Sequence, residues 1–114
     1  MKLSLVAAAA VLFCGCSSAV PPPNDSLATA TDALKSASAL GVNGGEAEEH
    51  ARRARAEIDR AVALMHEGKN EEARRVLTRA NVDAELALEL GRENVMMRRV
   101  RDAKAAALAA RQGE

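Results

Sequence analysis

Apolar and polar residues follow a helical period over most of the chain. In two long segments apolar residues recur three and four positions apart, which places them on one face of a helix at about 100° per residue. The first stripe comprises Ala47, Ala51, Ala54, Ile58, Ala61, Val62 and Met65. The second comprises Ala73, Val76, Leu77, Ala80, Ala84, Ala87 and Leu88. The pattern predicts amphipathic helices over residues 46–67 and 70–110. Oppositely charged residues four positions apart flank the stripes and predict ion pairs along single helices: Glu48 with Arg52, Glu49 with Arg53, Glu71 with Arg75, and Arg79 with Asp83.

A poorer stripe predicts one earlier helix, over residues 25–40. Its apolar face consists of Leu27, Ala30, Thr31 and Leu34. Asn24 or Asp25 is a suitable N-cap for this helix, and Asn70 is one for the last helix. The glycine-rich stretch "GVNGG", residues 41–45, ends the first helix.

The short connection "EGKN" makes the second and third helices antiparallel neighbours. Pairing about Gly68 sets Glu46 opposite Gly91, and the remainder of the third helix should then project beyond the bundle. The alternative is a break at Gly91, with the tail folded back over the first helix. The expected fold is all-α, an antiparallel helical hairpin or small three-helix bundle with a long C-terminal helix.

Composition limits the kinds of site that the chain can form. Sixteen basic residues balance sixteen acidic ones, so a strong field for nucleic acid is not expected. The one aromatic residue is Phe13, near the start. Ligand pockets depend on aromatic side chains for contact area, and the rest of the chain has none. Alanine supplies much of the apolar content, which predicts a thin core.

The start of the chain has the layout of a bacterial export signal. Lys2 precedes an apolar run over residues 3–14, and small residues follow. This run of 12 residues is shorter than the roughly 20 that a membrane-spanning helix needs. Both cysteines, Cys14 and Cys16, lie at the end of the run, and their spacing is not that of a redox C-x-x-C pair.

The stretch "FCGC" followed by "SS" resembles the lipobox of bacterial lipoproteins. In that motif a small residue, here Gly15, precedes a cysteine that is acylated and becomes the mature N-terminus. The resemblance therefore implies Cys16 as the lipidation site, although Phe13 stands where the motif usually has leucine. Ser17 after the cysteine implies sorting to the outer membrane. The alternative is ordinary cleavage after Ala19, which would release a soluble exported protein.

These features divide the chain into four parts. We expect a lipoprotein signal peptide over residues 1–15, a lipidated cysteine with a proline-rich tether over 16–24, a helical domain over 25–111 and a tail over 112–114. Consecutive prolines favour an extended polyproline conformation, so the tether should be stiff.

The segment from Ala54 through "MHEGKNEEARRVLTRANVDAELA" resembles the domain-of-unknown-function-4398 family. The resemblance covers about residues 21–100. These are alanine-rich bacterial envelope proteins, many with lipoprotein signals, and the family has no established activity. Family members are often encoded beside outer-membrane-protein-A-like, peptidoglycan-binding proteins, which implies a role in the cell envelope.

No set of residues predicts catalysis or a cofactor. His50 and His66 lie 16 positions apart on one helix, so they cannot share a metal within one chain. Met96 and Met97 are soft copper ligands by type, but no further ligand accompanies them. Without a nucleophile, a general base or a metal set, we expect no enzymatic activity, no cofactor and no metal.

Two features of the third helix predict a binding surface. An apolar stripe faces away from the second helix, and a basic cluster follows near its end; from residue 92 onward there are six basic and three acidic residues. The stripe comprises Val82, Leu86, Leu90, Met97 and Val100. The basic cluster comprises Arg98, Arg99 and Arg101. The plain alternative to a binding surface is a solvated helix end.

We therefore expect a lipid-anchored cell-envelope protein with a structural or adaptor role. It would lie at the periplasmic face of the outer membrane and present a helical surface to peptidoglycan, to an outer-membrane-protein-A-like partner or to another copy of itself. The alternative is a soluble periplasmic helical module that binds a ligand or senses stress.

Overall fold

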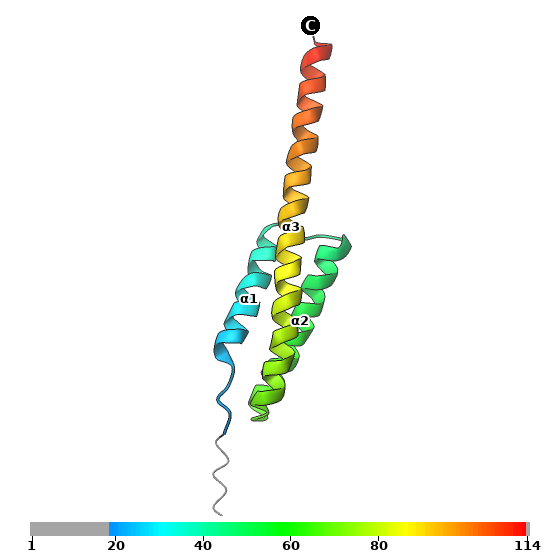
Figure 1. The fold of residues 1–114 in the computed structure, drawn as a ribbon. Coiled ribbons are helices and arrows are strands. Elements are labelled where there is room, and N and C mark those ends of the chain that lie inside the picture. Colours follow the sequence, from blue (N-terminus) through cyan, green and yellow to red (C-terminus); the bar gives the residue numbers. More distant parts are fainter. Residues whose placement is uncertain (1–18, 114) are drawn as a thin grey trace, which may run out of the picture.

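The computed structural model describes residues 19–113, which form three helices in an up-down-up arrangement (Figure 1). They are α1 (Asn24–Ala39), α2 (Gly45–His66) and α3 (Asn70–Gln112). No strand occurs among the residues described. The predicted fold class, a small three-helix bundle with a long C-terminal helix, is confirmed. The predicted signal peptide lies outside the described residues.

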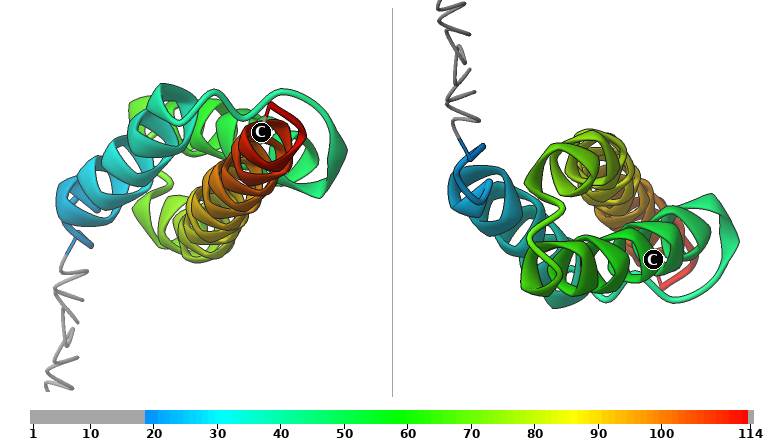
Figure 2. Two further views of the ribbon diagram at one scale, coloured as in Figure 1. Left: turned by 90° about the horizontal axis from the view of Figure 1, so that it is seen from above. Right: turned by 90° about the horizontal axis from the view of Figure 1, so that it is seen from below.

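The helix α3 is the centre of the bundle, because α1 and α2 both pack on it and contact each other less (Figure 2). One cluster of the core joins Leu77 and Val76 of α3 to Ala61 of α2, with Leu27 of α1 beside it. Nine of the twelve buried apolar residues in the described part are alanines. Small side chains let helix backbones approach closely, but they remove little apolar area from water.

The two long apolar stripes are confirmed as the buried faces of α2 and α3. Six of the seven predicted α3 residues are buried, and Leu88 is half-buried. The stripe of α1 was only partly right. Ala30 and Leu34 are buried as predicted, but Thr31 is exposed and donates its hydroxyl to the Leu27 carbonyl. Ala37, which the predicted stripe omits, is completely buried.

The predicted turns are present, but the predicted caps are wrong. Gly41 and Gly68 have φ angles of 69° and 73°, a region that glycine adopts without steric cost. None of the three helices in the described part of the chain has a side-chain hydrogen bond at its N-cap, and Pro23 and Lys69 hold the positions expected of asparagine. The side-chain amide of Asn70 instead donates to the Val20 carbonyl, at 2.7 Å.

That hydrogen bond docks the end of the proline-rich segment onto the start of α3. Pro23 is buried, and Asn81 of α3 donates to the Ser26 carbonyl at 3.2 Å. The segment of residues 19–23 therefore leaves the bundle beside the turn between α2 and α3. The C-terminal end of α3 lies at the opposite end of the molecule (Figure 1).

The helix α3 runs without a break through Gly91, so the alternative of a folded-back tail is wrong. Gly91 is buried, and a Cβ at this position would lie 2.9 Å from Cγ2 of Val42. Glycine thus lets the connection between α1 and α2 cross close to α3. Beyond it residues 92–112, which we call the overhang, are exposed except for half-buried Val95.

Candidate functional site

The apolar stripe predicted on α3 lies on the surface. Val82, Leu86, Met97 and Val100 are between 42% and 58% exposed, and Leu90 is half-buried. Two of these five residues belong to the overhang and three to the bundle. The stripe therefore runs from the bundle onto the projecting end of α3, with Glu93 between its bundle part and its overhang part.

The helix α1 does not cover this stripe. It lies against the side of α3 that carries Asn81, as the bond to Ser26 shows. Val82 and Leu86 are about 100° and 140° away from Asn81 around the helix axis, by the helical rotation per residue. The helix α2 packs on a further side of α3. The side of α3 that carries Val82 and Leu86 is therefore covered by neither α1 nor α2.

The basic cluster does not form a single site, because its members point in different directions. Arg98 and Arg101 line an open hollow of about 500 Å³ together with Leu90 and Met97. The opposite wall consists of the connection between α1 and α2 and the first residues of α2. Arg99 is on the far side of the helix, about 160° from Met97 by helical rotation. The structure thus joins part of the cluster to the stripe and separates the rest.

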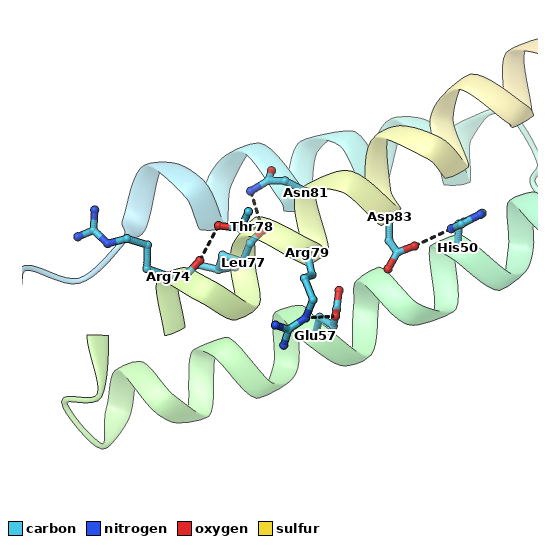
Figure 3. Close-up of polar contacts among 8 residues, drawn as sticks. All are labelled: His50, Glu57, Arg74, Leu77, Thr78, Arg79, Asn81 and Asp83. Carbon is cyan, nitrogen blue, oxygen red and sulfur yellow. Dashed lines mark hydrogen bonds and ion pairs between the residues drawn. The ribbon is translucent and has the colours of Figure 1, made fainter. Parts of the chain in front are cut away.

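Polar side chains also meet across the contact between α2 and α3 (Figure 3). His50 Nδ1 lies 2.6 Å from Asp83 Oδ1, and both side chains are only 16% exposed. Arg79 Nε lies 3.1 Å from Glu57 Oε1. Sequence reasoning missed both pairs, because it paired Arg79 with Asp83 along one helix. Both pairs join α2 to α3 across the contact between these helices.

Of the other ion pairs expected along single helices, two are present and one is not. Arg53 and Glu49 lie 3.3 Å apart, and Arg75 and Glu71 lie 3.6 Å apart. Glu48 accepts a hydrogen bond from the Gly44 amide instead of pairing with an arginine. All these groups are at the surface, so they stabilise the fold little.

At the α2–α3 turn, Glu67 raises the pKa of Lys69 through a hydrogen bond and its negative charge.

Within residues 19–113, no three His, Cys, Asp or Glu side chains gather closely enough to hold a metal ion. In the same part of the chain, no helix combines the length and hydropathy needed to cross a bilayer. Cys16, the predicted lipidation site, lies outside the described residues. The features that the structure does place are the apolar stripe, the overhang and the docked tether.

A family model described as a domain of unknown function (DUF4398) matches residues 25–103. The chain belongs to this family. The match begins in the first turn of α1 and ends inside the overhang, so the matched region spans nearly the whole bundle and the start of the overhang. No curated protein and no solved structure matches the chain.

Proposed function

We propose that this DUF4398 protein is a lipid-anchored component of the cell envelope with a structural or adaptor role. Cys16 carries the lipid at the periplasmic face of the outer membrane, and α3 presents its exposed side to an envelope partner. Peptidoglycan and an outer-membrane-protein-A-like protein are the candidate partners. The resemblance of "FCGC" to a lipobox supports the anchor.

The placement of the two ends supports the adaptor role. The docked segment leaves the bundle at the α2–α3 turn, and the overhang projects from the other end. A lipid attached at Cys16 is separated from the docked Val20 by only three residues, so it would hold that end of the bundle near the bilayer. The exposed side of the overhang would then remain free of the membrane and open to a partner.

The anchor is tested by labelling cells with radioactive palmitate. The wild-type chain should incorporate label, since more than one buried acyl chain is what makes anchoring stable. Cys16→Ser should lose the label completely. Cys14→Ser is the matched control and should keep it, because this cysteine is expected to leave with the signal peptide.

Absence of label from the wild-type chain would contradict the lipid anchor. Together with a mature N-terminus at Val20, that result would support the alternative, a soluble periplasmic binding or stress-sensor module. Label retained by Cys16→Ser and lost by Cys14→Ser would move the anchor to the other cysteine.

The adaptor role is tested by cross-linking in cells. Leu90→Glu combined with Met97→Glu should remove the cross-linked envelope partners, because two carboxylates would have to be desolvated in the contact. Helicity should be unchanged, since both residues are at least partly exposed. Ala56→Glu combined with Ala63→Glu, on the exposed face of α2, is the control and should keep the partners. An identical set of partners in both double variants would contradict a role for this side of α3.

A further inference from the structure

The exposed side of α3 carries a seven-residue repeat that the bundle does not use. Successive positions alternate four and three residues apart, which is the spacing by which one helix packs along another. We call these positions the pairing face: Leu86, Leu90, Glu93, Met97, Val100, Lys104, Ala107 and Arg111. All are exposed except Leu90, which is half-buried.

Two charged residues on this face decide which helix fits it. Glu93 and Lys104 stand among apolar positions, and neither has an ion-pair partner within residues 19–113. A helix packed along the face must therefore bring a cation to Glu93 and an anion to Lys104. A second copy of the same face supplies both, provided that it runs in the opposite direction.

We propose that α3 pairs with α3 of a second copy in antiparallel orientation, with Met97 of each copy opposite Val100 of the other. In this register Glu93 faces Lys104 twice, once on each side of the two-fold axis. Leu90 faces Ala107, and Leu86 faces the apolar stem of Arg111, whose charged head can reach water. Every apolar position meets an apolar group and every enclosed charge meets its opposite.

Other arrangements of two copies lack this match. Parallel pairing sets Glu93 against Glu93 and Lys104 against Lys104, and like charges opposite one another are unfavourable. Moving the antiparallel register by one repeat in one direction sets Leu86 against Lys104 and Glu93 against Met97. Moving it the other way sets Lys104 against Val100. Both shifts enclose charges without partners, which costs free energy.

The overall charge distribution favours the same orientation. Residues 24–91, which form the bundle, carry nine basic and thirteen acidic side chains, a net charge of −4. Residues 92–113 carry six basic and two acidic side chains, a net charge of +4. In the antiparallel register the last part of each basic overhang, residues 106–111, lies along residues 86–91 of the acidic bundle of the other copy, and only residues 92–105 lie along each other. Parallel pairing lays the two basic overhangs together over their full length.

The contact is long and narrow. From Leu86 to Arg111 it covers 26 residues, or about 39 Å of helix. A single pair of helices forms an interface at the small end of the stable range, so we expect a reversible dimer. The two Asn70 residues would lie about 85 Å apart, by the helical rise, at opposite ends of the dimer. Pairing requires only α3 and is independent of the lipid anchor. It covers Leu90 and Met97, so a second copy would compete with an envelope partner for this side of α3.

Sedimentation equilibrium of the full chain carrying Cys14→Ser and Cys16→Ser tests the pairing without interference from native thiols. This chain should show a monomer–dimer equilibrium. Glu93→Lys alone and Lys104→Glu alone should each weaken the dimer by about tenfold or more, since like charges then face each other. The double variant Glu93→Lys with Lys104→Glu should restore the dimer. Glu85→Lys makes the same charge change on exposed α3 surface off the pairing face and should leave the equilibrium unchanged.

Either a chain that stays monomeric at every concentration or a double variant no stronger than the two single ones would overturn the proposal. Disulfide formation gives the orientation directly. A mixture of Glu93→Cys and Lys104→Cys chains, in the same cysteine-free background, should form the mixed disulfide dimer. Rapid disulfide formation between two Glu93→Cys chains would indicate parallel pairing and would also overturn it. These experiments use the purified chain. Failure of the dimer to form would therefore not change the interpretation of the palmitate and cross-linking tests, which address the envelope role in cells.

Discussion

Replacing Ala54 by aspartate should unfold most of the bundle. Ala54 is completely buried in α2, where it packs with Leu34 of α1 and Ala84 of α3. A carboxylate there would be enclosed by three helices with no cation in the cluster to pair with it. Burying an unpaired charge costs several kcal/mol, and we expect a loss of more than about 3 kcal/mol in the free energy of unfolding. Small domains have only about 5–15 kcal/mol in total, and this alanine core should lie near the lower limit.

Circular dichroism at 222 nm during thermal unfolding measures this effect. Ala56→Asp is the matched control, because it makes the same substitution two residues along the same helix at an exposed position. It should cost no more than about 0.7 kcal/mol, the difference in helix propensity. Equal thermal midpoints for the two variants would mean that the face of α2 toward the core has been assigned wrongly.

The helices and their pairing were predictable from sequence because the apolar period alone determines them. Alanine, valine and leucine at helical spacing indicated the buried faces of α2 and α3, and the short turn at Gly68 set the register. In this register a residue of α2 lies opposite a residue of α3 when their two residue numbers sum to about 137, as the numbers of Glu46 and Gly91 do. The bond between Glu57 and Arg79 obeys the same relation.

The pair of Glu57 and Arg79 could have been found from this register, but local spacing was used instead. The pair of His50 and Asp83 lies about one helical turn away from the register and could not have been found from it. Arg79 and Asp83 are four apart, so pairing them along one helix was the simplest assumption. The antiparallel helix offers each a nearer partner in a less exposed place, His50 for Asp83 and Glu57 for Arg79. Tertiary contact therefore overrode the local pairing rule.

The side of α3 that remains exposed was harder to predict, because it depends on where α1 lies. The stripe of α1 is short, and no charge pattern showed which side of α3 it would contact. The deciding contacts are the polar bonds of Asn81 to Ser26 and of Asn70 to Val20. The helix-capping rule assigned Asn70 a different role, and sequence alone does not show that a distant carbonyl would take its amide.

Replacing Leu77 by alanine should destabilise the protein more than any other truncation of a leucine. Leu77 is the largest side chain that is fully buried, in a core otherwise built mainly of alanine. It packs with Ala61, Ala73 and Val76 where α1, α2 and the start of α3 meet. The small neighbouring side chains cannot rearrange to fill the space that it leaves. The free energy of unfolding is therefore lowered both by the lost transfer free energy of the side chain and by the full cost of the cavity. We expect a loss of about 3 kcal/mol in the free energy of unfolding, within the 2–5 kcal/mol range for such changes.

Urea unfolding followed by circular dichroism gives the free energy of each variant. Leu108→Ala is the control, since Leu108 is 59% exposed near the end of the overhang and touches no part of the core. Measured at a concentration where the chain is monomeric, it should change the free energy by less than about 0.5 kcal/mol. A loss below about 1 kcal/mol for Leu77→Ala would mean that the helices close around the missing side chain, and that this alanine core is more compliant than its packing indicates.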